Sequence, residues 1–149
     1  MKRLGALLMA ALALPVVAFA DSKAVHGRWL VAGGNAVVEV RDCGDGTPCG
    51  YLDWVDMRQA SSDRDINNPD PELKGRPLIG MPMLWGFREK GSSWGRGRIY
   101  DPEEGKTYGS NLKRLDDGNL RVKGCIGPLC KTQIWTPAQA NAQPGQGGQ

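Results

Sequence analysis

The 149-residue sequence has few of the side chains from which catalytic and metal sites are usually built. Its single histidine, His26, has no cysteine near it at the spacing of metal ligands. A histidine-dependent nucleophile is therefore unsupported. Ser110 and Lys113 have the spacing of a serine acyl-enzyme pair, but they fall in a predicted strand, where residues three apart point to opposite faces. We predict no catalytic residue, no cofactor and no metal ion.

A large excess of one charge is also missing. The formal net charge is +3, and loss of Lys2 and Arg3 would lower it to +1. Nucleic-acid binders normally carry a strong basic excess, so the composition argues against nucleic acid as a partner. It gives no reason to expect electrostatic attachment to anionic membranes either.

Long apolar runs are absent except at the N-terminus. Two basic residues precede an uncharged, mostly apolar run over positions 4–17, and Ala18-Phe19-Ala20 follows with the small residues that a signal peptidase requires. A membrane-spanning helix needs about 20 apolar residues, which is more than this run provides. We predict that residues 1–20 are a signal peptide cleaved before Asp21. The protein would then be periplasmic or secreted, without stable membrane insertion.

Residues 137–149 contain no charge and consist of Pro, Ala, Gln, Asn and Gly. Such a segment cannot bury enough apolar surface to offset its ordering entropy, so we predict a disordered tail. Residues 21–26 form a short flank, and residues 27–136 are left as one domain. A domain of this size gains only modest stability from its core, so covalent support is expected.

Four cysteines can supply that support. Cys43 and Cys49 bracket a turn-rich interval, and Cys125 and Cys130 bracket another. Four cysteines allow three pairings, and we predict the two local ones because each closes a tight turn. A structural zinc site is the alternative, which the ligand separations and the predicted export disfavour.

Short β-prone runs separated by turn residues recur along the domain, with no convincing long helix. Turns of two to four residues join antiparallel neighbours, and a sheet of such strands exposes its edges unless it closes. We therefore predict an all-β fold, a single antiparallel up-and-down β-barrel of about eight strands. The predicted strands cover residues 27–31, 36–42, 50–56, 82–90, 93–101, 106–115, 119–126 and 131–136.

Alternation indicates which residues share a face in two of these strands. In the third, Leu52 and Trp54 are predicted on one face, with Tyr51, Asp53 and Val55 on the other. The fifth places Arg96 and Arg98 on one face and glycines on the other. An inward arginine face would need buried anions, whereas an outward one would turn glycines to the core, and the pattern does not decide between them.

Five tryptophans fall in predicted strands, where they either fill the barrel or line an apolar cavity. Core filling is the more common role of such rings. If the barrel is hollow, the candidate ligand-binding residues are aromatic side chains of its strands: Trp54, Trp85, Trp94, Tyr100 and Tyr108.

One connection, residues 57–81, is long enough to suggest a functional role. Its segment Asp63-x-Asp65-x-Asn67 begins like a calcium loop, but Asn68 and Lys74 replace the glycine and glutamate that such a loop needs, so we interpret it as a solvated turn. In a meander this loop lies at the end of the barrel that holds the Cys125–Cys130 turn, opposite the Cys43–Cys49 turn, and would cover a cavity there. Its candidate functional residues are polar: Asp65, Asn67, Asn68 and Arg76.

Several motifs along the chain carry a resemblance to a known family. They are Gly27-x-Trp29, Cys49-Gly50, Asp65-x-Asn67-Asn68-Pro69-Asp70-Pro71, Gly75-Arg76-Pro77-Leu78-Ile79-Gly80, Trp94-x-x-Gly97-x-Ile99-Tyr100-Asp101-Pro102, Gly105-Lys106-Thr107-Tyr108 and Thr132-Gln133-x-Trp135-Thr136. Together they resemble the exported bacterial family called domain of unknown function 2147. The resemblance implies export and a compact β domain, but no reaction. The chain departs from the pattern at Pro137, where the family would have arginine. Gly27-x-Trp29 and the strand count are also similar to lipocalins and other calycins, in which a tryptophan of the first strand closes one barrel end.

These observations support three hypotheses for function. The first is a non-enzymatic binder of a small, partly apolar or amphiphilic molecule in the cell envelope. The second is a protein-interaction or inhibitor module that acts through residues 57–81 and predicts a filled barrel. The third is an envelope hydrolase, which needs two Asp or Glu side chains facing each other across a cleft.

Overall fold

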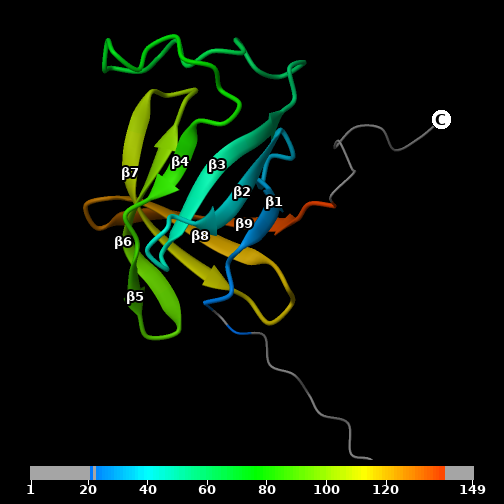
Figure 1. The fold of residues 1–149 in the computed structure, drawn as a ribbon, viewed down its shortest axis with the longest axis vertical. Coiled ribbons are helices and arrows are strands. Elements are labelled where there is room, and N and C mark those ends of the chain that lie inside the picture. Colours follow the sequence, from blue (N-terminus) through cyan, green and yellow to red (C-terminus); the bar gives the residue numbers. More distant parts are fainter. Residues whose placement is uncertain (1–20, 22, 140–149) are drawn as a thin grey trace, which may run out of the picture.

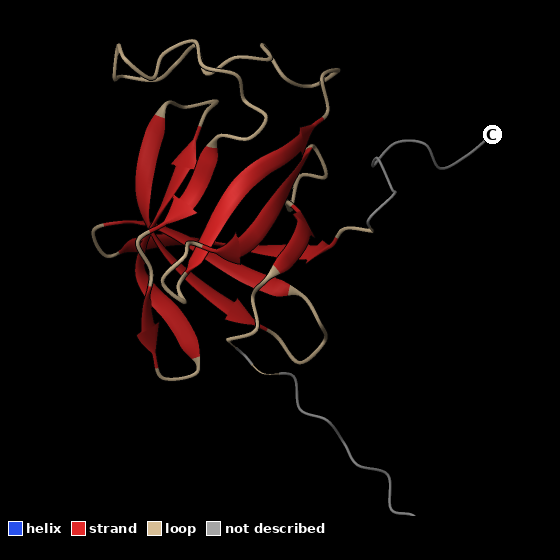
Figure 2. Ribbon diagram, in the orientation of Figure 1, coloured by secondary structure: helices blue, strands red, loops and turns tan. Residues whose placement is uncertain are grey.

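The computed structural model describes residue 21 and residues 23–139. The predicted signal peptide and most of the predicted disordered tail, residues 140–149, lie outside the described residues. Within them the chain forms nine β-strands and no helix, which confirms the all-β prediction (Figures 1 and 2). The strands are β1 (Gly27–Leu30), β2 (Ala36–Asp42), β3 (Pro48–Val55), β4 (Pro82–Trp85), β5 (Arg88–Lys90), β6 (Ser93–Asp101), β7 (Lys106–Arg114), β8 (Leu120–Ile126) and β9 (Leu129–Pro137).

The strands form one closed antiparallel sheet. Their order is β4-β3-β2-β1-β9-β8-β7-β6-β5, and a further pairing of β4 with β6 closes the barrel. β4 and β5 both pair with β6, at opposite ends of it, so eight staves surround the interior and β5 is an additional short strand. The predicted strand 82–90 is thus divided at Gly86, whose φ of 72° suits glycine best. The predicted up-and-down barrel of about eight strands is confirmed.

The meander places alternate connections at the same end of the barrel. Residues 31–35, 56–81, 102–105 and 127–128 lie at one end, called here the open end. The long connection, residues 56–81, crosses the top of the view in Figure 1. Residues 43–47, 91–92 and 115–119 lie at the other end, called the closed end. The long connection therefore shares its end with the Cys125–Cys130 turn, as the sequence predicted.

Residues 23–26 of the N-terminal flank seal the closed end. Trp29 is buried on β1 and its indole Nε1 donates to the Val25 carbonyl at 2.9 Å. The Trp94 Nε1 donates to the carbonyl of Lys23 at 3.0 Å. The Arg114 guanidinium lies 4.6 Å from the centre of the Trp29 ring, a cation–π distance. Large rings with satisfied N–H groups thus fill this end, so ligand access is confined to the other.

A β-bulge in β6 decides which way its arginines face. Arg96 has a φ of 58°, and the register with β7 shifts between Trp94 and Gly97. Arg96 and Arg98 are exposed, so the arginine face points outward. Gly97, which faces inward, leaves no empty space in the core, because a Cβ on it would lie 2.2 Å from the Phe87 ring. Phe87 fills the core space that Gly97 leaves.

Two disulfides join Cys43 to Cys49 and Cys125 to Cys130, which are the local pairs that the sequence predicted. They cross the 43–47 turn at the closed end and the β8–β9 hairpin at the open end. Each disulfide links the two ends of a short turn.

Replacing Cys43 and Cys49 together with serine is expected to lower the free energy of unfolding by about 2 kcal/mol, because the unfolded chain regains the entropy of a short open loop. Urea denaturation of the oxidised protein and the variant measures the difference. The same exchange at Cys125 and Cys130, which close a loop of similar length, should have a similar effect. A loss near zero for both pairs would contradict the account.

Candidate ligand-binding site

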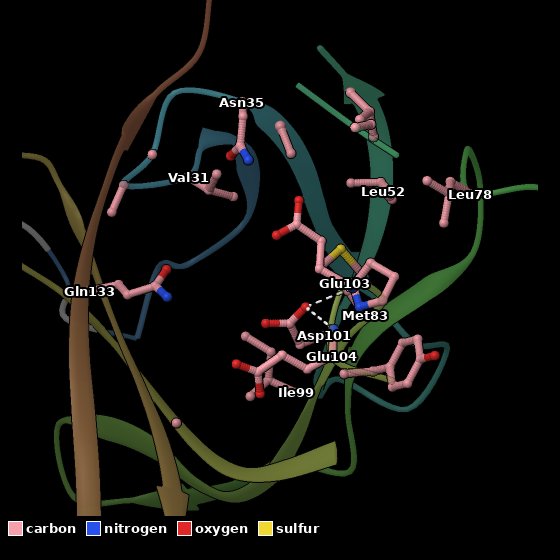
Figure 3. A pocket seen from close by; sticks show the side chains of 18 of the residues that line it. Val31, Asn35, Leu52, Leu78, Met83, Ile99, Asp101, Glu103, Glu104 and Gln133 are labelled. Carbon is pink, nitrogen blue, oxygen red and sulfur yellow. Dashed lines mark hydrogen bonds between the residues drawn. The ribbon is translucent and has the colours of Figure 1, made fainter. Parts of the chain in front are cut away.

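A cavity of about 750 Å³ occupies the barrel interior and opens at the open end. Its wall is mainly apolar, and Figure 3 shows side chains from several strands pointing into it. The apolar side chains that line it come from β2, β3, β4, β6, β8, β9 and the connections at this end: Val31, Ala32, Ala36, Leu52, Val55, Ala60, Ile66, Leu78, Met83, Ile99, Pro102, Val122, Ile134 and Trp135. A volume of this size is typical of sites that enclose a small organic molecule.

Trp135 joins the cavity to the packed core beneath it. The residue is 1% exposed, belongs to the core cluster and lines the cavity. Its Nε1 donates to Gln133 Oε1 at 2.8 Å, so the indole N–H is satisfied without a ligand. At Trp135 the cavity wall therefore carries an indole without an unpaired N–H donor.

The mouth carries acidic groups at the end of β6 and on the β6–β7 turn. Asp101 accepts hydrogen bonds from the backbone N–H groups of Glu103 at 2.9 Å and Glu104 at 3.3 Å (Figure 3). The Tyr108 hydroxyl donates to the Glu104 carboxylate. This hydrogen bond, together with burial, raises the pKa of Tyr108 to about 12. The Tyr108 hydroxyl is therefore neutral at physiological pH, with its proton engaged by Glu104.

A buried polar cluster anchors the long connection to the barrel. Asp65 is fully buried, and the hydroxyl of Tyr100 on β6 donates to its Oδ1 at 2.6 Å. Its other oxygen, Oδ2, accepts from Asn68 Nδ2 at 2.8 Å and Arg76 Nε at 3.1 Å. Burial and the hydrogen bond to Asp65 raise the pKa of Tyr100. The prediction of a solvated turn is wrong for Asp65, because the carboxylate faces Tyr100 rather than water.

A second contact fixes the same connection to the β6–β7 turn. Asn67 Nδ2 donates to the carbonyls of Pro102 at 3.2 Å and Glu103 at 2.9 Å. Gly105 passes so close that a Cβ on it would lie 2.0 Å from the Asn67 carbonyl oxygen. The long connection is thus held against the rim beside the mouth, and its Arg64, Ile66 and Asn67 complete the cavity wall.

Replacing Asp65 with alanine is expected to lower the free energy of unfolding by about 3 kcal/mol, because Arg76 and the Tyr100 hydroxyl lose a buried charged acceptor. The milder variant Tyr100→Phe removes one hydrogen bond and should cost about 1 kcal/mol. Urea denaturation measures both. Equal losses in the two variants would contradict the view that Asp65 is the centre of the cluster.

The structure separates the five aromatic candidates. Tyr100 and Tyr108 line the cavity, whereas Trp54, Trp85 and Trp94 do not. Trp94 belongs to the seal of the closed end, and Trp85 follows the fully buried Leu84 on β4 and is only half-buried.

Trp54 differs from the prediction because of a bulge in β3. Val37 pairs with Trp54 while Val38 pairs with Leu52, so Asp53 is an extra residue and the alternation restarts after it. Leu52 and Val55 both line the cavity as a result, and Trp54 does not. The predicted grouping of Leu52 with Trp54 on one face is therefore wrong.

The polar candidates of the long connection lie in two contacts. Asp65, Asn68 and Arg76 meet at Tyr100, and Asn67 meets the β6–β7 turn. These polar residues of the long connection therefore serve to anchor it to the barrel. Sequence reasoning missed the lining role of Trp135, although its alternation with Ile134 and its place opposite Leu120 could have indicated an inward ring.

Across residue 21 and residues 23–139, no group of three or more His, Cys, Asp or Glu side chains is arranged to hold a metal ion. In the same part of the chain, no helix is long and apolar enough to span a membrane.

A closed antiparallel barrel of eight staves with room inside for one small ligand is the architecture of the lipocalin-like folds. The chain belongs to the family described as an uncharacterized protein conserved in bacteria (DUF2147), whose model matches residues 27–137. A solved structure, protein HP1028 from the human pathogen Helicobacter pylori, described as belonging to the lipocalin family, is similar with a TM-score of 0.68 and 22% identity. The match covers 80% of this chain and 86% of that one. No curated protein matches the sequence.

Proposed function

We propose that this protein is an exported, non-enzymatic binder of a small, partly apolar molecule in the bacterial envelope. The observation that carries the proposal is the cavity of about 750 Å³ with a mainly apolar wall, lined by residues of the open end. An apolar ligand that enters the cavity removes its own apolar surface and that of the wall from water. This removal of apolar surface from water is the main driving force for binding. The two disulfides accord with an oxidising compartment.

The polar groups at the mouth support an amphiphilic rather than a purely apolar ligand. The Tyr108 hydroxyl donates to Glu104 and can still accept a hydrogen bond, and Glu103, Lys131 and Gln133 also line the cavity. A ligand with an apolar body inside and a polar group at the rim satisfies both environments. The same residues therefore set orientation, while the apolar wall sets affinity.

The arrangement of carboxylates favours binding over hydrolysis. The three acids that line the cavity lie together, Asp101 as the last residue of β6 and Glu103 and Glu104 in the β6–β7 turn. Asp101 is engaged by backbone N–H groups and Glu104 by Tyr108. A carboxylate hydrolase needs two acids on opposite sides of the bond that is cleaved, whereas these acids share one side of the mouth. The protein-interaction hypothesis predicted a filled barrel, and the hollow interior favours the binder.

Displacement of an environment-sensitive apolar fluorophore tests the proposal. The chain from Asp21 onward is titrated with the fluorophore, and medium-chain and long-chain amphiphiles with anionic, cationic and neutral head groups then compete for it. We expect saturable binding of one fluorophore per chain and displacement by at least one amphiphile class. Absence of saturable binding by every probe would refute the proposed function.

A further inference from the structure

Exposed apolar side chains are distributed unevenly over the molecule. Within the described part of the chain, six of the seven large apolar residues that are exposed lie at the open end. They lie in the long connection or at the tip of the β8–β9 hairpin: Met57, Ile66, Leu73, Ile79, Ile126 and Leu129. The seventh, Ile134, lies within β9. The end of the barrel that opens to the cavity is therefore the end that presents apolar side chains to its surroundings.

The most exposed of them form a rigid projection. Ile126 is 64% exposed and Leu129 is 77% exposed, on either side of a two-residue turn. The Cys125–Cys130 disulfide closes the hairpin directly behind them. In Figure 1 this hairpin, here called the tip (residues 125–130), extends away from the barrel. Two large apolar side chains held out by a disulfide cannot fold back onto the core to escape water.

Lysines flank the tip on both faces of the hairpin. Lys131 lines the cavity mouth beside Gly124, with which it pairs. Lys123 stands next to Gly124 on β8, so its side chain points to the opposite face. The tip itself carries no charge. An uncharged apolar point with ammonium groups on both sides suits the boundary between acyl chains and anionic head groups.

From this arrangement we infer that the open end docks on a lipid membrane surface, with Ile126 and Leu129 entering the interface between head groups and acyl chains. The mature chain is nearly neutral, so long-range electrostatic attraction is weak and the apolar tip supplies the main contact. Docking is peripheral and reversible, because two side chains bury too little surface for stable anchoring. The cavity mouth then faces the lipid phase.

A membrane fits the tip better than a folded protein does. A specific protein interface buries about 800 Å² on each partner and places its apolar groups in a broad, well-packed patch. Here the two most exposed residues sit on a narrow, convex hairpin.

Vesicle flotation tests the inference. The chain from Asp21 to Gln149, which contains all nine strands and lacks the apolar residues 1–20, is mixed with vesicles of phosphatidylcholine alone and of phosphatidylcholine with phosphatidylglycerol. We expect flotation with both, and more with the anionic mixture. The double variant Ile126→Ser with Leu129→Ser should reduce the partition coefficient by about tenfold or more, since it removes both apolar contacts. The control Ile134→Ser, which exchanges an isoleucine of β9 that is 40% exposed and lies away from the tip, should float like the parent.

Three outcomes would overturn the inference: no flotation of the parent protein, flotation unchanged in the double variant, or a dimer in analytical ultracentrifugation that the double variant dissociates. The last would assign the tip to a second copy of the chain. Fluorophore binding without vesicles is measured on the same samples. It reports on the cavity alone, so the failure of membrane docking and the failure of the proposed ligand binding are distinguishable.

Discussion

Substitution of Gly124 by phenylalanine is expected to weaken ligand binding by at least about tenfold while the barrel stays folded. Gly124 lines the cavity, and a Cβ on it would meet Ile99 at 3.7 Å and Tyr108 at 3.8 Å, which are ordinary contact distances. The backbone therefore accepts a side chain, and aromatic residues are favourable in strands. The new ring would occupy the space that we assign to the ligand. We expect fluorophore affinity to fall by at least about tenfold, which corresponds to about 1.4 kcal/mol.

The matched control is Gly109→Phe. Gly109 lies on the neighbouring strand β7 between Tyr108 and the buried Ser110, so its own side chain would point outward, with Cys125 O at 3.5 Å from the new Cβ. It adds the same ring to the outer surface of the barrel. Unfolding by urea and fluorophore titration are measured for both variants. Equal affinities of Gly124→Phe and Gly109→Phe, with both proteins folded, would place the ligand outside the barrel.

Substitution of Gly105 by alanine is expected to detach the long connection and lower the free energy of unfolding by about 3 kcal/mol. Gly105 has a φ of 64°, a conformation that costs a residue with a side chain about 1 kcal/mol. The added Cβ would also lie 2.0 Å from the Asn67 carbonyl oxygen, and a backbone atom cannot rotate out of the way. The long connection must then move, and its hydrogen bonds to the β6–β7 turn are lost.

Gly118→Ala separates these two effects. Gly118 has a φ of 84° in a turn at the closed end, and its nearest neighbour is the end of the Arg114 side chain at 3.9 Å. This variant should lose only the conformational term, about 1 kcal/mol. Trypsin cleavage after Arg58 and Arg64 reports detachment of the connection. It should accelerate in Gly105→Ala and stay at the parent rate in Gly118→Ala. Similar stability and cleavage rates in both variants would show that the close approach of Gly105 to Asn67 does not hold the long connection in place.

Local signals predicted the strands well because they act over a few residues. Runs such as 36–42 and 93–101 coincide with β2 and β6, since alternation and turn residues are written into each short segment. The disulfide pairs were predictable for the same reason, because only five or six positions separate their partners. The predicted run 82–90 was longer than either β4 or β5. The strand is interrupted at Gly86, and the residues on either side of it give no sequence signal for an interruption.

The candidate site was predicted only in part. Tyr108 was identified as a lining residue from its ring and its strand, and the structure places it there. Trp54 was not separable from the lining set, because one extra residue at Asp53 turns every later side chain in β3 to the other face. The role of Asp65 was also hidden, because its partner Tyr100 is thirty-five residues away in the chain.

The amino-acid sequence by itself determined the strands, the turns between them, the two local disulfides and the family. The strands, turns and disulfides depend on residues close together in the chain, where hydrophobic periodicity and turn residues are local signals. Only the tertiary structure decided that β4 meets β6 to close the sheet, that Asp65 is buried against Tyr100, and that the interior is hollow. Whether space remains inside a closed sheet depends on how side chains from all the staves pack together, and no segment of the chain carries that information alone.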